Sequence, residues 1–568
     1  MGCIPRKAGY AVQSNRNTLS FQQEYFTRGF IVSVPLMLSK QLRFLHPYLH
    51  ATGLLLMVVG LPFSMLFMSL SQFFIGGNWI LEGDYTVKWK RFRSNKIAIM
   101  LCCLFLLYLP TTLWSSNADE SLKMLRINLP LLIFPFVMGS SKPLPSGWYF
   151  NLMRVFVASV VLSTVVCAAI GLPQWINGTL NDIRHISLFI SHIRFALLIV
   201  LAIFLCIWMV IYQPFRLAPI ERVAYILAII WCLFFMVILQ SLNGFFVLLG
   251  VGLLWLVIEM KKKLSAKTGF ILTALIFAVS AVSALLLVQT WKSYFTPAAI
   301  YNSALPERSR AGNLYRHQLD FIENGYYINS FVCETELHAG WASCSNYGLD
   351  STDLKGHPIK TTLIRYLNSK GLGKDAEGIK QLTKTDIQNI ENGIANVKYA
   401  GLWGLRMRFY QLMYEYSFYQ QGGKNASGHS LLMKWEFWKT GLNILLENPI
   451  MGVGIGDVPD AFRTYYQKNN TWLTQDWWMT CHNQYLYFGV AGGIPLLILF
   501  LFFFLTPAFK IWRTSILPFK LFLGISLLAM TTEDMLTTQA GVSFIAFFYS
   551  FFAFSRFSKE ESQNAVEV

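Results

Sequence analysis

The sequence has few charged residues. Only 14% of the 568 residues are Asp, Glu, Lys or Arg, whereas 54% are hydrophobic, and the mean hydropathy is +0.44. A soluble protein of this length carries about 25% charged residues. The sequence also lacks internal repeats, low-complexity segments and an N-terminal apolar core with a small-residue cleavage site. These absences exclude a soluble globular protein and predict an integral membrane protein without a cleaved signal peptide.

Acidic residues are fewer than basic ones, so the formal net charge is +17. The basic residues gather in short connections between apolar runs, as at 88–96, 261–263, Lys510 and Arg513. This distribution follows the positive-inside rule for membrane proteins. It argues against a nucleic-acid partner and indicates membrane lipids as the surroundings of the chain.

Apolar runs long enough to cross about 30 Å of hydrocarbon recur along the chain. The first run is long for one span and short for two, but a basic N-terminus on the inner side requires it to cross twice, with Pro62 and the glycines at 76 and 77 as candidate breaks. We therefore expect an all-α polytopic membrane protein with about 12 transmembrane helices. The runs are 48–82, 97–114, 125–140, 150–172, 187–213, 222–241, 243–260, 268–290, 484–506, 516–532 and 540–555.

Alternation from the basic connection at 88–96 assigns a side to every segment, and each basic connection then falls inside. The expected order is a cytoplasmic tail at 1–47, a first transmembrane bundle at 48–290 and a large outer loop at 291–483. A second transmembrane part follows at 484–556, and a cytoplasmic tail at 557–568. The loop, between the ninth and tenth spans, is mainly helical in this interpretation.

Two helices are predicted in the loop. One opens at 384–386, where Thr385 and Gln388 have the spacing of a capping box. The other runs from Ser430 to about Glu447, and Asn448-Pro449 ends it. Its apolar residues fall on one face, which predicts a helix at the membrane interface or against the bundle; they are Leu431, Trp435, Trp438, Leu442 and Leu445.

Two cysteines, Cys333 and Cys344, lie close together in the polar part of the loop. If the loop faces an oxidising compartment, these cysteines can form a disulfide. The sequence therefore offers this pair as a candidate bridge.

The most informative segment begins with W-K-T-G-L-N-I-L-L-E-N-P-I-M-G-V-G-I-G-D at 438–457 and continues with H-N-Q-Y-L from His482, at the mouth of the next span. This segment resembles the O-antigen ligase family, in which a Trp-bearing helix ends in Asn-Pro or His-Pro and is followed by Gly-x-Gly-x-Gly and His-Asn. Residues 183–195 and 427–495 carry the resemblance most specifically. The many spans and one large late loop agree with it, and 291–426 resembles the enlarged insertion of Bacteroidetes-type members.

The resemblance implies a glycosyltransferase of the GT-C type in the bacterial inner membrane, with its active site facing the periplasm. Such an enzyme transfers a glycan from an undecaprenyl diphosphate donor to a sugar hydroxyl, usually on lipid A–core. The donor carries its own leaving group, so the resemblance implies neither a cofactor nor a metal. No metal-binding spacing of His, Cys and carboxylates and no Asp-x-Asp motif occurs in the sequence.

His482 is the candidate general base, because an imidazole titrates near neutral pH and the acceptor hydroxyl must lose a proton. The alternative is a histidine that caps a helix or anchors at the interface beside Tyr485. The flanking pattern favours the catalytic role.

Cations are required to stabilise the negative charge of the pyrophosphate leaving group. Arg194 lies within an apolar run, where an arginine is costly unless it is paired or functional. The family has an essential arginine in this region, which we map to Arg194, with Arg184 as second choice. For Arg184, snorkelling to the interface is an alternative.

A second arginine of the family usually lies four residues before the helix tryptophan, where this chain has Lys434. Lysine keeps the charge but loses bidentate geometry. Either Lys434 takes this role or another loop cation does, for which Arg316, Arg406 and Arg408 are candidates; a solvated or interfacial Lys434 is the alternative.

Several further residues are supporting candidates. The glycines of 452–456 form either a phosphate-binding turn or a plain turn between helices. Asp457 is a candidate for orienting His482 or an acceptor sugar, and Asn483 lies next to the histidine. Glu533 and Asp534 lie in a short outer connection, where they either bind a sugar or an arginine or are solvated.

Three other functions compete. An O-antigen polymerase uses the same type of donor with a lipid-linked acceptor, and a protein-glycosylating ligase uses a different acceptor. A transporter or flippase for polysaccharide lipids is of another class, but it predicts internal repeats and paired broken helices, which the sequence does not have.

Overall fold

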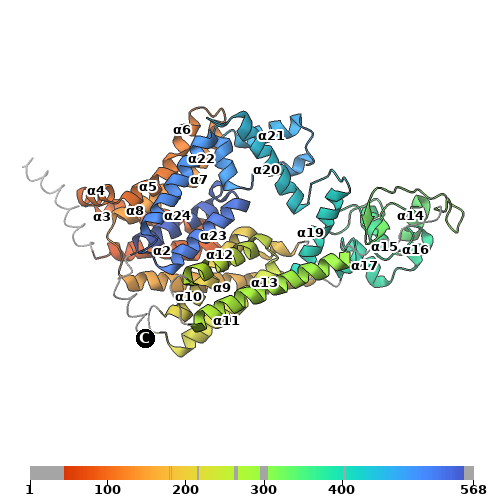
Figure 1. Ribbon diagram of the computed structural model, residues 1–568, viewed down its shortest axis with the longest axis horizontal. Coiled ribbons are helices and arrows are strands. Elements are labelled where there is room, and N and C mark those ends of the chain that lie inside the picture. Colours follow the sequence, from red (N-terminus) through yellow and green to blue (C-terminus); the bar gives the residue numbers. More distant parts are fainter. Residues whose placement is uncertain are drawn as a thin grey trace, which may run out of the picture.

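The computed structural model describes residues 44–555 except 178, 181, 214–216, 261–265, 295–304 and 401–403. Most of the predicted tail at 1–47 and all of the tail at 557–568 lie outside these residues. The described chain is mostly helical and has two hydrophobic cores. One core lies in a helical body built by α2–α12 and α20–α24, and the other lies in a loop unit at 305–400 (Figure 1).

The predicted first bundle contains most helices of the body and also α13, which lies outside it. These are α2 (His46–Phe63), α3 (Met65–Glu82), α4 (Tyr85–Ser94), α5 (Lys96–Leu106), α6 (Tyr108–Thr112), α7 (Ala118–Asn128), α8 (Pro130–Ser140), α9 (Ser146–Ile176), η1 (Ile183–Ile186), α10 (His192–Tyr212), α11 (Pro219–Leu239), α12 (Leu242–Met260) and α13 (Ala266–Tyr294).

The run at 48–82 forms two helices, as a double crossing requires. The break is at Ser64, two residues after Pro62, where the backbone is extended, and not at the glycines at 76 and 77. The helices pack antiparallel, since Ser71 Oγ donates to Gly53 O at 2.6 Å and Asn78 Nδ2 donates to His46 O at 3.1 Å. The chain thus turns back on itself in this run.

Five described helical segments are long and apolar enough to cross a membrane. These are Ala118–Ser140, which joins α7 and α8, and Ser146–Ile176, His192–Tyr212, Pro219–Leu239 and Gln484–Ile511. A sixth is the bent pair of Tyr85–Ser94 and Lys96–Thr112, the second of which joins α5 and α6. Four shorter apolar helices are Leu242–Ile258, Phe277–Lys292, Leu517–Thr532 and Gln539–Phe554. These helices identify a multi-pass membrane protein, while the count of about twelve spans stays a prediction.

The helices after the loop unit complete the body. They are α20 (Ser430–Glu447), α21 (Val458–Lys468), η2 (Gln475–Trp477), α22 (Gln484–Ile511), α23 (Leu517–Thr532), η3 (Met535–Thr537) and α24 (Gln539–Phe554). α10 and α24 lie at its centre, because nearly every residue of α24 is buried and α10 contacts α9, α11, α12 and α23. The last helix of the chain, α24, is therefore packed among early helices, namely α2, α3, α7 and α8.

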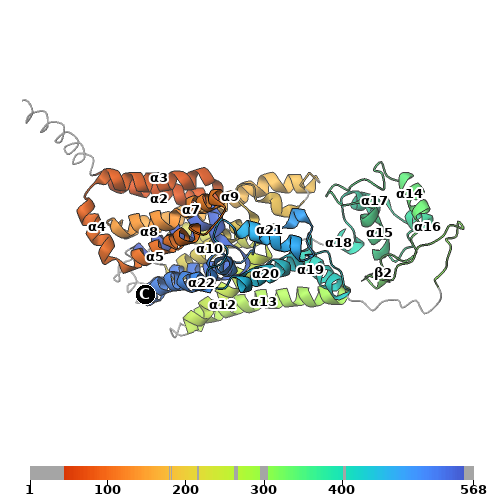
Figure 2. The ribbon, with the colours of Figure 1, turned by 90° about the horizontal axis from the view of Figure 1, so that it is seen from above.

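The loop unit lies at one end of the molecule, away from α20–α22 (Figures 1 and 2). Its elements are β1 (Ile322–Glu323), β2 (Tyr326–Tyr327), α14 (Glu334–Ala342), α15 (Ile359–Ser369), α16 (Ala376–Lys380), α17 (Lys384–Glu391) and α18 (Val397–Ala400). The helix α19 (Gly404–Gln420) joins it to α20. The small antiparallel hairpin β1–β2 is a departure from the all-α prediction.

Two predictions for the loop unit are corrected. The predicted helix at 384 forms, but its capping box is Thr383 with Asp386, not Thr385 with Gln388. The disulfide is absent, since both Cys333 and Cys344 have free thiols. The nine residues of α14 separate the two cysteines by roughly 13 Å along the helix axis, beyond the reach of a disulfide.

Candidate active site at the mouth of α22

His482 occupies the turn that leads into α22. Its φ of 45° is in the left-handed region, which is uncommon for a residue other than glycine and costs backbone energy. The imidazole packs on Phe437 of α20, with ring centroids 5.3 Å apart. The backbone and α20 together fix the direction of the ring.

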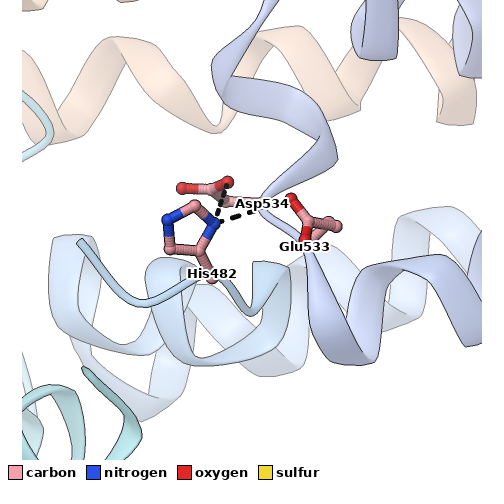
Figure 3. Close-up of side chains that lie close together, drawn as sticks. All are labelled: His482, Glu533 and Asp534. Carbon is pink, nitrogen blue, oxygen red and sulfur yellow. Dashed lines mark ion pairs between the residues drawn. The ribbon is translucent and has the colours of Figure 1, made fainter. Parts of the chain in front are cut away.

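The Nδ1 atom of His482 faces two carboxylates. It lies 3.5 Å from Glu533 Oε2 and 3.9 Å from Asp534 Oδ1 (Figure 3). Both acids are buried, at 2% and 6% exposure, and Thr480 Oγ1 donates to Asp534 Oδ2 at 3.1 Å. The solvated alternative for Glu533 and Asp534 is therefore wrong.

The three groups shift one another's pKa values. Burial alone would lower the pKa of His482, but the bond to Glu533 and the charges of both acids outweigh it and raise that pKa. Burial likewise opposes ionisation of Glu533, yet His482, Lys434 and Arg194 lower its pKa below the ordinary value. Burial and the Glu533 charge raise the pKa of Asp534. The arrangement favours an ionised Glu533 that stabilises a proton on His482.

Lys434 reaches this cluster from α20. Its Nζ donates to Thr532 O at 3.0 Å and lies 3.5 Å from Glu533 Oε1. The alternative of a plain solvated lysine is thus wrong, although the side chain keeps 29% exposure. The ammonium group lies between solvent and the buried acids.

Arg194 approaches from the N-terminus of α10. Its charge lowers the pKa of Glu533. It also lowers the pKa of Asp534, but by less than burial raises it. One NH1 donates to Ser191 Oγ at 3.1 Å, and the buried Nε has no hydrogen-bond partner in the described part of the chain. A buried donor without a partner is costly, so Arg194 retains the capacity to bind an anion.

Arg184 lies in η1 and is paired with Asp182, to which its Nε donates at 2.8 Å. Arg184 lies near Arg408 of α19. Burial lowers the pKa of Arg408 most, and the charge of Arg184 lowers it further. Arg408 also donates from NH1 to Gln411 Oε1 at 2.7 Å. These two arginines form a second basic area beside α19.

The other two loop arginines do not reach His482. Arg316 pairs in a β-bridge with Val332 of the loop-unit core, and its NH1 lies 3.2 Å from Glu334 Oε1. Arg316 is thus engaged with a carboxylate of the loop unit, which folds around its own core. Arg406 is exposed on α19.

The glycine run at 452–456 is a structural turn. The N–H groups of Val453 and Gly454 donate to Val490 O and Ala491 O, both at 2.9 Å, where α22 is broken at Gly492 and Gly493. Gly493 has a φ of 72°, and a Cβ there would lie 2.4 Å from Ile450 O. These amides are not directed at phosphate, so the plain-turn alternative is confirmed.

Asp457 and Asn483 hold segments together. The carboxylate of Asp457 accepts from the N–H groups of Ser116 and Asn117, both at 2.7 Å, and these bonds lower its pKa despite burial. It does not orient His482, which corrects that prediction. Asn483 caps α22 through Leu486 N and donates to Thr531 O at 3.0 Å, which ties α22 to the end of α23.

The helix α20 has the predicted bounds, Ser430–Glu447, and ends at Asn448. Three residues of the predicted apolar stripe face outward, with Leu431, Trp435 and Leu442 at 50–57% exposure. The other two do not, since Leu445 is buried and Trp438 packs against the core. Exposed apolar and Trp side chains are typical of helices at membrane interfaces. Lys434 points inward from this helix.

The same cluster has the composition of a metal site. Among the described residues, the ligand atoms of His482, Glu533 and Asp534 lie within 4.8 Å of one another. No spacing in the sequence could reveal it, because the acids and the histidine belong to different segments. Lys434 supplies a positive charge at the same carboxylate.

Sequence reasoning missed Asn243, Thr480 and Thr532. Thr532 Oγ1 donates to Asn243 Oδ1 at 2.7 Å, and the buried Nδ2 of Asn243 has no hydrogen-bond partner among the described atoms. A polar residue two positions after Ser241, at the start of an apolar run, is the signal that was available. Asn243 Nδ2 is thus a second unused donor in this site, besides Nε of Arg194.

The fold and this site define a multi-pass membrane protein with a buried histidine–carboxylate cluster and adjacent cations. Residues 400–501 match the family model described as O-antigen ligase, and this match supports membership of the chain in the O-antigen ligase family. The matched segment contains Lys434 and His482, while Arg194, Glu533 and Asp534 come from outside it. No curated protein matches the chain. The family indicates a membrane glycosyltransferase of the ligase or polymerase type.

Proposed function

We propose that the protein transfers a glycan from undecaprenyl diphosphate to a sugar hydroxyl of lipid A–core, at the periplasmic side of the bacterial inner membrane. The observation that carries this proposal is the contact of His482 with Glu533, flanked by Lys434 and Arg194. A base and two cations at one membrane-proximal place are the groups that this reaction requires.

His482 acts as the general base. Its Nδ1 faces Glu533, which leaves Nε2 for the acceptor hydroxyl; the only described contact of Nε2 is Met479 Sδ at 3.5 Å, a weak hydrogen-bond partner. Ionised Glu533 stabilises the imidazolium that forms when the hydroxyl attacks the anomeric carbon. The acceptor oxygen forms the new bond as the bond to the diphosphate breaks.

Arg194 and Lys434 bind the departing diphosphate. Cations aimed at the leaving group stabilise negative charge as it develops. Arg194 has an unused donor for this purpose, and Lys434 is loosely held at 3.5 Å from its carboxylate. Donor binding replaces these contacts by phosphate oxygens.

These two side chains also replace a metal in the proposed reaction. Both place positive charge beside Glu533 from the protein itself. We therefore expect transfer to persist when the enzyme is treated with EDTA; a loss that Mg²⁺, Mn²⁺ or Zn²⁺ restores would assign His482, Glu533 and Asp534 as metal ligands instead.

The ligase and polymerase reactions share this donor chemistry and differ in the acceptor. Purified protein in nanodiscs is given a lipid diphosphate donor with either lipid A–core or a second lipid-linked glycan. Product on lipid A–core supports the ligase assignment. Product on the lipid-linked acceptor alone assigns a polymerase, and transbilayer movement of the donor without transfer assigns a flippase.

His482→Ala tests the catalytic assignment. Loss of a general base lowers the rate by about 10²–10⁴-fold. The matched control is His357→Ala, since His357 is an exposed histidine of the loop unit with 65% side-chain exposure. Equal protein levels with transfer lost only in His482→Ala are expected, whereas transfer at the wild-type rate would refute the assignment.

A further inference from the structure

A cavity of about 180 Å³ lies between the loop unit and α19, outside the candidate active site. Its walls come from the hairpin region at 321–329, from α15 and from the C-terminal half of α19. A single water molecule needs about 10–15 Å³ of such volume, so the cavity has room for a ligand much larger than water. Neither the family match nor the proposed reaction assigns a ligand to it.

The wall is aromatic on one side. Phe321 and Phe418 are stacked with centroids 5.3 Å apart, and Tyr414 lies 6.2 Å from Phe418. Aromatic rings present rigid apolar surface to a ligand. Such surface suits the apolar face of a sugar ring.

The remaining wall offers hydroxyl and amide groups. Thr361 of α15 is exposed at the rim, and Asn329 makes only one long side-chain bond, from Nδ2 to Asp320 Oδ1 at 3.4 Å. Ligand pockets combine a mainly apolar lining with a few such orienting groups. A ligand with many hydroxyl groups finds both donors and acceptors here.

The one arginine in the cavity wall is already paired with a carboxylate, so its positive charge is compensated. Arg365 lines the wall, but its Nε and NH2 donate to Glu323 at 3.0 Å each, and its guanidinium lies 4.0 Å from the Tyr414 ring centroid. A phosphate would compete with this buried carboxylate. The lining therefore favours a neutral hydroxylated ring over an anion.

The cavity is connected to the active site through two consecutive helices. Phe418 stacks on His429, the residue before α20, with centroids 5.4 Å apart, and Glu415 accepts from Leu431 N at 2.8 Å. Lys434 lies one turn further along α20. A chain of sugars that ends at His482 can thus extend along α20 and α19 toward the loop unit.

We propose that this cavity binds a sugar unit of the glycan, remote from the bond that reacts. This inference rests on the proposed function, which supplies a glycan as substrate. The loop unit then selects or retains the glycan chain, while the helical body performs the transfer.

The test uses full-length protein in nanodiscs, because detergents with sugar head groups would compete. The probe is the glycan released by mild acid from lipid-linked saccharides of the source cells, followed by saturation-transfer NMR. Thr361→Trp fills the cavity from its exposed rim, and Thr385→Trp, at an exposed position of α17, is the control. We expect binding by wild type and Thr385→Trp and its loss in Thr361→Trp.

His482→Ala separates the two proposals, since it should bind the glycan without transferring it. With a donor carrying a single repeat unit, Thr361→Trp should transfer at the wild-type rate, and with a long-chain donor its KM should rise. Absence of glycan binding by the wild type, or equal binding by Thr361→Trp, would overturn the inference and leave the catalytic proposal standing. Glycan binding without any transfer would overturn the catalytic proposal instead.

Discussion

In the loop unit, Glu323 receives two bonds from Arg365 at 3.0 Å and a third from Asn396 Nδ2 at 3.0 Å, whereas Glu533 in the helical body lies 3.5 Å from both Lys434 and His482. Both carboxylates are almost fully buried, at 1% and 2% exposure. The difference is in how completely the partners satisfy them. A carboxylate with good geometry on every side stabilises a fold, while loosely held cations can rearrange toward a ligand.

The largest expected effect concerns the satisfied pair. Glu323→Gln leaves the Arg365 charge without its partner and should destabilise the loop unit by about 3–5 kcal/mol. Hydrogen exchange of amides at 305–400 in the full chain measures this. Glu377→Gln, which removes an exposed ion pair with Arg310, is the control and should cost at most about 1 kcal/mol. Equal protection in both variants would remove the distinction drawn above.

Arg194→Gln should act on donor binding and not on folding. Loss of a charge-assisted bond costs about 1.5–3 kcal/mol, or roughly 10- to 100-fold in the KM for the lipid diphosphate donor. Steady-state transfer at varied donor concentration measures it, with thermal unfolding as the check on stability. An unchanged donor KM would mean that Arg194 does not bind the donor and, like Arg365, serves the fold.

Lys434→Met should have a smaller effect, because the side chain is partly exposed. We expect about 1 kcal/mol, or roughly fivefold in donor KM. Lys434→Arg is the matched control and should bind the donor at least as well, because guanidinium binds phosphate in a bidentate manner. If Lys434→Met and Lys434→Arg have the same KM, the lysine does not bind the donor.

The smallest expected effect is a shift in pH dependence. A base must be neutral, so the transfer rate should rise with pH through the raised pKa of His482. In Glu533→Gln the burial of His482 and the Lys434 charge dominate and lower that pKa, so the acid limb of the pH profile should move to lower pH while the maximal rate falls. An acid limb that stays in place would mean that Glu533 does not control the proton on His482.

The sequence predicted those features that depend on local patterns. The bounds of α20, its end at Asn448 and the reversal after Pro62 all follow from periodicity and helix-breaking residues. The position of His482 before α22 follows from the same reasoning. The glycine turn was also available as an alternative, because glycines permit tight turns wherever they occur.

Long-range packing could not be predicted in this way. Glu533 and Asp534 follow an apolar run in a short connection, which is the position of a solvated loop, and only the folding of α20 and 479–482 over them makes them buried. For the cysteines, proximity in sequence was misleading because α14 intervenes. Hydropathy reports the average surroundings of a segment, but not which other segment covers it.

The break in α22 has a consequence for the order in which the chain is assembled. Val490 and Ala491 would expose unpaired carbonyl groups in hydrocarbon if the turn at 453–454 did not bond to them, and such groups cost several kcal/mol. Synthesis proceeds from the N-terminus, so the turn is made before this part of α22. The carbonyl groups at the break therefore have partners that precede them in the chain, and the interrupted helix can close on these partners as it is made.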